Sequence, residues 1–305
     1  MLLDNNKLPD FMIVGAPKSG TTSLYHYLKT NKNIFFPNRK EPWFFSSKDD
    51  PNRRGVINNL KDYVELFKPA KTGQIIGEAS VSYLCAYDTT IKNIKNVYGK
   101  RSKDIKIIMI LRNPMDRLFS RYNMFVRDNW IKNEDFLSSV EKEFKQRNPD
   151  NYFWDDNYID CSLYYERVIA YKDNFENVLC IKYDDFKENS EKIVEDVFEF
   201  LNVDKIKVNT KIKFNNSGNP KNKLIHNLIN HDNIFKRVIK LIVPFDIRVR
   251  IKEMINNSNL KPSRISKKDY EYLYNKYFKE DIEKLEKLLG WDLDDWKSYE
   301  KYYKK

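Results

Sequence analysis

The stretch FMIVGAPKSGTTSLYHYL, residues 11–28, decides the fold. Its first five residues, 11–15, are mostly apolar and stop at a glycine, which is typical of a buried parallel strand. A helix is expected to follow at once, because Leu24, Tyr27 and Leu28 recur at helical spacing. A strand that runs directly into a helix is the repeating unit of an α/β sheet.

The junction between that strand and that helix, GAPKSGTT, has the composition of an anion site. Backbone N–H groups and the helix dipole attract a phosphate at such a junction, and Thr21 or Thr22 is expected to cap the helix. Gly15 and Gly20 bracket four residues, which is the outline of a P-loop. Thr21 stands where a P-loop has its lysine, and the lysine of this segment is Lys18. We predict that Lys18 faces the bridging oxygen of a 5′ group shorter than a triphosphate; the alternative is a glycine turn that merely starts a helix.

Three more apolar runs predict further strands, at Gln74–Glu78, Lys106–Leu111 and Asn177–Tyr183. Pro114 suits the first turn of a helix after the second of these, and Gly290 is expected to stop the closing helix. The alternation predicts an α/β, three-layer, P-loop-like fold with a central, mostly parallel sheet flanked by helices and a helical C-terminal third. No linker divides the chain, so we expect a single domain over residues 1–305. Helices are expected at residues 163–175, 191–201, 226–243, 246–255 and 267–289, with a loop at residues 215–222.

Composition narrows the function classes. The chain has 305 residues, 41% apolar and 32% charged, and a formal net charge of +11 that attracts anions. No run approaches the roughly 18 apolar residues of a membrane helix, so we expect neither a membrane span nor a leader sequence. Cys85, Cys161 and Cys180 lie far apart and are odd in number, which favours reduced packing residues in a cytoplasmic protein.

A second anion motif is LRNPMDRLFSR, residues 111–121. Arg112 leaves the end of a predicted strand and Ser120 lies on the helix that follows, and ligands of open α/β sheets bind at the carboxyl ends of strands. A guanidinium fork and a hydroxyl could hold one phosphate there. The alternative is a salt-bridged helix start with Asp116 and Arg117 on its surface.

In this order and spacing, the two motifs resemble the 5′-phosphosulfate loop and the 3′-phosphate site of sulfotransferases that use 3′-phosphoadenosine 5′-phosphosulfate (PAPS). KEPWFF at residues 40–45 is similar to the KE-x-x-FF segment of the heparan sulfate N- and 3-O-sulfotransferases. GEASVSYL at residues 77–84 is similar to their second-strand segment, and residues 279–296 resemble the closing helix and tail of bacterial members. The chain is identified as a bacterial-type member of this family.

The resemblance implies that PAPS is the donor, that adenosine 3′,5′-bisphosphate is the product, and that no metal is required. Lys18 would stabilise the departing bridging oxygen, and Arg112 and Ser120 would hold the 3′-phosphate that distinguishes PAPS from ATP. The late loop is similar to one that closes over the nucleotide in related enzymes, although it lacks the cysteine of the heparan-modifying enzymes. The residues expected to bind the nucleotide are Pro17, Lys18, Ser19, Gly20, Thr21, Thr22, Ser23, Arg112, Ser120, Tyr183, Asn216, Ser217 and Lys221.

The resemblance also implies a glutamate base. Glu41 matches the glutamate of the KE-x-x-FF segment, which removes the proton of the acceptor, and none of the three histidines stands in a matching segment. The expected acceptor is a hydroxyl, or an amine, of a carbohydrate-type molecule, with a lipid or another alcohol as the alternatives. Residues expected to contact the acceptor are Lys40, Trp43, Glu78, Ser80 and Tyr83.

Two other classes remain open at this point. A P-loop kinase or NTPase would suit the same fold, but it would place a lysine where Thr21 stands, and the strand at residues 106–111 ends in Arg112 instead of an aspartate. A nucleic-acid-binding protein would use the basic surface and the 20 Tyr, 19 Phe and 5 Trp for stacking. Most of these aromatics recur at apolar positions, which favours a core, so no nucleic-acid partner is expected.

Overall fold

The computed structural model describes residues 7–47, 56–128, 130–132, 134–146, 159–211, 219–222, 255, 260–261 and 263–304. The predicted helix at residues 226–243 lies outside these residues, as does that at 246–255 apart from Ile255. The predicted nucleotide contacts of Asn216 and Ser217 also lie outside them.

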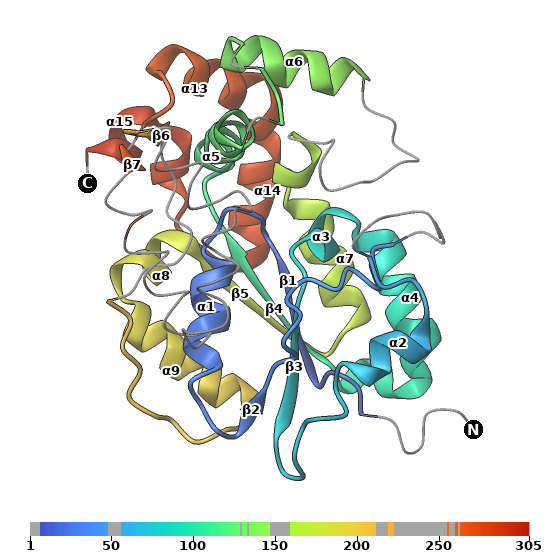
Figure 1. Ribbon diagram of the computed structural model, residues 1–305. Helices are drawn as coiled ribbons and strands as arrows, with labels where there is room; N and C mark the ends of the chain where they lie inside the picture. Colours follow the sequence, from blue (N-terminus) through green and yellow to red (C-terminus); the bar gives the residue numbers. More distant parts are fainter. Residues whose placement is uncertain are drawn as a thin grey trace.

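Five parallel strands form the central sheet, in the order β2-β3-β1-β4-β5 (Figure 1). β1 (Phe11–Gly15) and β4 (Lys106–Leu111) occupy the predicted residues, and β3 (Ile75–Ala79) and β5 (Asn177–Lys182) lie within one residue of them. The edge strand β2 (Ile34–Phe35) is unpredicted, because two residues are too few to show a period. The prediction of a parallel α/β sheet is confirmed.

Side chains of the central strands alternate between the two faces of the sheet. Ile107 and Met109 belong to one buried cluster, whereas Ile108 and Ile110 belong to the other. This is the two-residue period of a strand that is covered on both sides. Helices α1, α8 and α9 cover one face, and α2, α4 and α7 cover the other (Figure 1).

The helices form largely where the apolar pattern predicts them. α7 and α9 fall within one or two residues of the predicted bounds, and Pro114 is the first residue of α5 behind the cap residue Asn113. The closing helix is interrupted by a π-helical turn, and Gly290 ends it with φ of 63° as predicted. The helical elements are α1 (Thr21–Leu28), α2 (Leu60–Glu65), α3 (Ser82–Cys85), α4 (Tyr87–Tyr98), η1 (Gly99–Asp104), α5 (Pro114–Arg127), α6 (Phe136–Gln146), η2 (Asp160–Ser162), α7 (Tyr165–Asn174), α8 (Tyr183–Glu188), α9 (Ser190–Leu201), α13 (Lys267–Leu273), η3 (Tyr274–Phe278), α14 (Lys279–Leu289), η4 (Asp294–Lys297) and α15 (Tyr299–Tyr303).

Two predictions about local structure are wrong. Neither Thr21 nor Thr22 caps α1, because both lie inside the helix and Gly20, with φ of 81°, is the cap residue. The predicted late loop contains the short strand β6 (Asn219–Pro220), which pairs with β7 (Leu260–Lys261) in an antiparallel ribbon.

The prediction that all three cysteines are reduced is also wrong. Cys85, at the end of α3, forms a disulfide with Cys161 of η2, and their Cα atoms lie 4.8 Å apart. The two residues are 76 positions apart in the sequence, so no local spacing announces the pair. Cys180 remains a free thiol. The argument for a cytoplasmic location thus loses two of its three cysteines, and that location stays a prediction.

No helix within the described ranges is both long and apolar enough to cross a membrane.

Candidate active site

The phosphate loop lies between β1 and α1, at the carboxyl edge of the sheet. Ser19 is 0% exposed, and its hydroxyl has no hydrogen-bond partner among the described residues. A buried hydroxyl without a partner is costly, so this one marks a place where a ligand oxygen would be met. The first N–H groups of α1 have no acceptor within the helix, and they point out of its N-terminus toward the phosphate loop. The loop therefore fits the 5′-phosphate end of a nucleotide.

Glycine is required at position 20 for two reasons. Its φ of 81° belongs to the left-handed region, and an added Cβ would lie 3.1 Å from Phe186 and 3.2 Å from Tyr183. The backbone of the phosphate loop therefore packs directly against α8. This close approach brings Tyr183 to the loop, and its contact with a nucleotide stays a prediction.

Lys18 is half-buried in the loop, with φ of 68°, and its Nζ lies 3.5 Å from the sulfur of Met124 on α5. Burial, together with the charges of Arg127 and Arg112, lowers the pKa of the Lys18 ammonium to about 7. Asp128 opposes them. An anion bound beside Lys18 would favour its charged form again.

Arg112 connects the two predicted anion motifs. Its Nη1 donates to the carbonyl oxygen of Lys18 at 2.6 Å, and its Nε and Nη2 both contact one oxygen of Asp116, at 2.8 and 2.6 Å. The guanidinium also lies over the ring of Tyr183, 4.7 Å from its centroid. Although burial alone would lower the pKa of Arg112, the Asp116 carboxylate raises it. The two ends of a nucleotide would therefore meet cationic groups that are already linked.

The alternative interpretation of this motif, a salt-bridged helix start with Asp116 and Arg117 on the surface, is correct only for the salt bridge. The Asp116 carboxylate is largely enclosed, and despite its burial the contact with Arg112 holds its pKa below the usual range. Arg117 is fully buried and donates from Nε to the hydroxyl of Ser162 at 2.8 Å. Ser120 is buried on α5, one turn beyond Asp116. Lys221 is exposed, directly after β6, which contacts α5.

The segment that carries Glu41 is attached to the end of β3 by its backbone. The N–H groups of Glu41, Trp43 and Phe45 donate to the Ala79 carbonyl, the Ser80 hydroxyl and the Tyr83 hydroxyl, at 3.1, 3.3 and 3.3 Å. Glu41 and Trp43 both have positive φ, 58° and 56°, which non-glycine residues adopt only when their surroundings hold them. The Glu41 carboxylate forms an ion pair with Lys40, and its side chain is 23% exposed.

Glu78 occupies a different environment from the one predicted. The sequence predicts acceptor contacts for Glu78, Ser80 and Tyr83, but the structure buries all three completely beneath the segment that carries Glu41. One oxygen of Glu78 accepts from the hydroxyls of Tyr63 and Tyr83, at 3.0 and 2.7 Å. Burial, with a smaller contribution from the nearby Glu41 charge, raises the pKa of Glu78 to about 7 against the opposing effect of the hydroxyl groups that donate to it. These residues lie beneath the segment that carries Glu41, whereas Lys40 and Trp43 of that segment are half-buried, and their contact with an acceptor stays a prediction.

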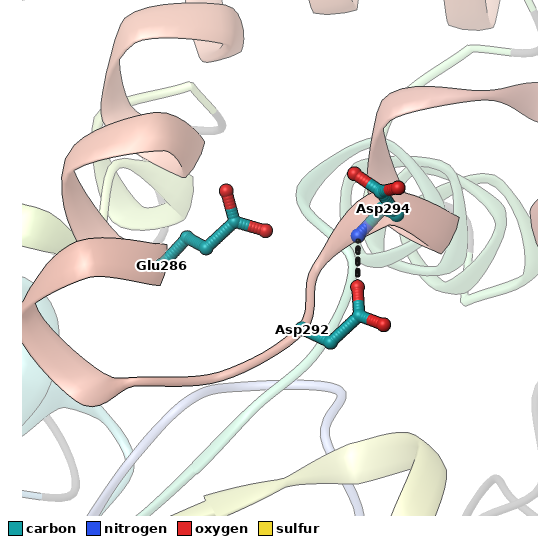
Figure 2. A group of neighbouring side chains, drawn as sticks. All are labelled: Glu286, Asp292 and Asp294. Atoms are coloured by element: carbon teal, nitrogen blue, oxygen red, sulfur yellow. Dashed lines mark hydrogen bonds between the residues drawn. The ribbon is translucent and has the colours of Figure 1, made fainter.

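Three carboxylates near the C-terminus, Glu286, Asp292 and Asp294, lie close together (Figure 2). Lys297 already supplies the positive charge there, since its Nζ lies 2.7 Å from Glu286 and 3.0 Å from Asp294. Figure 2 also shows the Asp294 N–H donating to an Asp292 oxygen, at 2.9 Å. We interpret the group as an ion-paired turn that starts η4.

Sequence reasoning missed Tyr302 and Tyr303, whose hydroxyls reach Asp116 from the far end of the chain. It also missed Tyr63, which contacts the buried Glu78. The residues KYYKK at the C-terminus look like a solvated tail, and only the tertiary structure shows where they lie. No sequence signal could have connected these tyrosines to the anion motifs.

Comparisons with known proteins agree with this geometry. The family model described as "Sulfotransferase domain" matches residues 8–237. The crystal structure of a sulfotransferase from Alicyclobacillus acidocaldarius is similar with a TM-score of 0.71 and 28% identity, over 95% of this chain and 99% of that one.

Curated relatives align over shorter regions. The membrane-associated sulfotransferase kil1 of Dictyostelium discoideum is 30% identical over 125 residues, 41% of this chain and 24% of that protein. Carbohydrate sulfotransferase 15 of Mus musculus is 29% identical over 161 residues, which cover 40% of this chain and 28% of that protein. Heparan sulfate glucosamine 3-O-sulfotransferase 3A1 of Mus musculus is 29% identical over 124 residues, which cover 40% of this chain and 28% of that protein. The chain spans about a quarter of the length of these relatives. Because the family model matches well over half of the chain, the chain belongs to the PAPS-dependent sulfotransferase family that its two anion motifs predict.

Proposed function

We propose that the protein transfers the sulfuryl group of PAPS to a hydroxyl, or less readily an amine, of a carbohydrate-type acceptor. The observation that carries the proposal is the 2.6 Å hydrogen bond from Arg112 to the Lys18 carbonyl. It joins the loop suited to the 5′ end of the donor to the arginine suited to the 3′-phosphate. Both lie at the carboxyl edge of the sheet, where ligands of open α/β folds bind.

At the 5′ end, this chain would hold a phosphate through the buried Ser19 hydroxyl and the N-terminal N–H groups of α1, together with Thr21 and Thr22. PAPS supplies the sulfuryl group and leaves as the 3′,5′-bisphosphate. Negative charge grows on the departing bridging oxygen, and the Lys18 ammonium would stabilise it there.

At the 3′ end, Arg112 would donate to the 3′-phosphate with the N–H groups that Asp116 and Lys18 leave unused. A guanidinium carries five donors, and three of them are engaged in the contacts described. Ser120, Tyr183 and Lys221 would add a hydroxyl, a ring surface and a further charge, and Asn216 and Ser217 belong to the same proposal.

We assign the role of general base to Glu41. Its carboxylate is partly exposed beside Lys40, whereas Glu78 is enclosed by Tyr63 and Tyr83. The acceptor oxygen would form its bond to sulfur as the bridging S–O bond breaks, and the acceptor proton would pass to Glu41. Such a base contributes roughly 10²- to 10⁴-fold to the rate.

A carbohydrate-type acceptor is favoured by two of the relatives, which are named as carbohydrate and heparan sulfate glucosamine sulfotransferases. Lys40 pairs with the Glu41 carboxylate, and Trp43 lies half-buried two residues further along the same segment, so the segment offers a charge and a ring for a polar, hydroxyl-rich molecule. A lipid or another alcohol would be the alternative acceptor.

Calorimetric titration tests the donor assignment. We expect the protein to bind adenosine 3′,5′-bisphosphate without metal and more tightly than ATP with Mg²⁺. We expect Arg112→Ala to lower the affinity for the bisphosphate. The exposed substitution Arg101→Ala is the matched control and should change neither affinity. Preference for ATP with Mg²⁺ would contradict the proposal.

A further inference from the structure

The C-terminal helix α15 reaches the proposed 3′-phosphate site. The hydroxyl of Tyr302 donates to one oxygen of Asp116 at 3.1 Å, and that of Tyr303 donates to the other at 2.7 Å. Tyr302 and Tyr303 lie 186 and 187 positions after Asp116 in the sequence. Two phenol donors meeting one largely enclosed carboxylate form a specific contact, which a loosely attached tail would not make.

Asp116 stands between the tail and Arg112. Arg112 uses its Nε and Nη2 on the same Asp116 oxygen that accepts from Tyr302. A carboxylate with donors on both oxygens is fixed in orientation, and it fixes the plane of the guanidinium that it contacts. The phenols also take up part of the negative charge of Asp116, which would otherwise repel a phosphate nearby.

The tail itself is held in place by contacts with the rest of the chain. Tyr270 accepts from the side-chain amide of Asn113 at 2.6 Å and donates to the Trp296 carbonyl at 2.8 Å, so the start of α5 and the tail share one hydroxyl. The Arg264 guanidinium lies 5.2 Å from the centroid of the Tyr303 ring. Within α15, the centroid of the Tyr299 ring lies 4.8 Å from that of the Tyr303 ring.

We propose that Tyr302 and Tyr303 are positioning residues for Arg112, so that recognition of the 3′-phosphate depends on the C-terminal tail. This inference rests on the proposed function, in which Arg112 binds that phosphate. The tyrosines act through Asp116 and need not touch the nucleotide.

The direction of the effect follows from both roles of the phenols. Without them, Asp116 keeps its charge but loses two donors, so it repels a phosphate more strongly. Arg112 also loses the fixed partner that orients it. Both changes weaken the binding of a 3′-phosphate directly, whereas they reach the 5′-phosphate loop only through the single hydrogen bond from Arg112 to the Lys18 carbonyl.

The experiment compares two nucleotides by calorimetry: adenosine 3′,5′-bisphosphate and adenosine 5′-monophosphate, which lacks the 3′-phosphate. In the Tyr302→Phe/Tyr303→Phe protein we expect the bisphosphate to bind about 10-fold more weakly, the size of one lost charge-assisted hydrogen bond. The monophosphate should bind within about twofold of the wild type. Tyr299→Phe is the matched control, because it removes a phenol from the same helix without removing a contact to Asp116, and it should change neither affinity.

A second measurement keeps the test decisive. In an Asp116→Asn background the two Tyr→Phe changes should have no further effect on the bisphosphate, since they act through that carboxylate. If the double variant does not fold, as judged by thermal unfolding, the single Tyr302→Phe and Tyr303→Phe proteins replace it.

Equal weakening of both nucleotides, or no weakening of either, would overturn the inference. If the wild-type protein itself does not prefer the bisphosphate, the proposed function fails, and the inference fails with it.

Discussion

At the scale of single residues, Glu41 and Glu78 show how the same side chain takes two roles. Glu41 is partly exposed beside Lys40, and Glu78 lies in the core under Tyr63 and Tyr83. Sequence analysis could propose Glu41 through its motif, but it could not separate the partly exposed carboxylate from the buried one. Burial depends on which side chains cover a residue, and these come from distant segments.

Replacing Glu41 by Gln should lower kcat by roughly 10²- to 10⁴-fold while affinity for adenosine 3′,5′-bisphosphate stays within twofold. The amide keeps the shape of the side chain but cannot accept the acceptor proton. Steady-state kinetics and calorimetry on the same preparation separate the two quantities. Glu65→Gln, at an exposed glutamate paired with Lys68, is the control and should leave both unchanged. A parallel loss of turnover and nucleotide affinity would mean that Glu41 is structural.

The binding of the bisphosphate should depend on pH through Lys18. With its pKa near 7 in the free protein, this lysine is largely uncharged at pH 8.5, and binding an anion must then take up a proton. Affinity is therefore expected to fall as pH rises above about 7. Titrations at several pH values, in two buffers of different ionisation enthalpy, measure the proton uptake. In Lys18→Met the dependence should disappear, and its persistence would assign it to another group.

At the scale of elements, the strands were predictable because they are apolar runs that end at glycine or a polar residue. The four longer strands fall within one residue of the predicted bounds, whereas the two-residue β2 carries no pattern. The start of α1 was misassigned to a threonine cap because sequence preference favours a hydroxyl there. The close packing of Tyr183 and Phe186 against Gly20 decides the cap instead, and it is a tertiary contact.

The end of β3 gives the fold a measurable pH response. The folded protein raises the pKa of Glu78 from 4.5 to about 7, so the folded state binds this proton more tightly than the unfolded chain does. That contribution to stability is complete below about pH 4.5 and is lost as pH rises through 7. Glu78→Gln has no proton to lose, so relative to wild type it should gain up to about 3 kcal/mol between pH 5 and 8. Urea unfolding of both proteins at each pH measures the difference. An unchanged difference across this range would show that Glu78 titrates normally.

At the scale of the whole molecule, the sequence predicted the parallel sheet and its two anion motifs but not the contacts that connect distant segments. The tail that reaches Asp116 and the disulfide between Cys85 and Cys161 join residues far apart in the chain. Such pairs leave no periodic signal, because each partner is placed by its own element. They became visible only when the elements were packed together.

The disulfide closes a loop of 76 residues that includes β4 and α5, the elements that carry the proposed 3′-phosphate site. It therefore restricts the conformations of this part of the chain in the unfolded state. Loop-closure entropy of that length stabilises the folded state by about 4 kcal/mol. Dithiothreitol should therefore lower the Tm of the wild-type protein. The Cys85→Ala/Cys161→Ala protein should have a lower Tm than the wild type, and dithiothreitol should not change it. Cys180→Ala is the control and should keep the response, since that thiol is free. A wild-type Tm that does not change once mass spectrometry shows the bond reduced would mean that native packing alone holds α3 against η2. The disulfide would then contribute nothing to the stability of the nucleotide side of the fold.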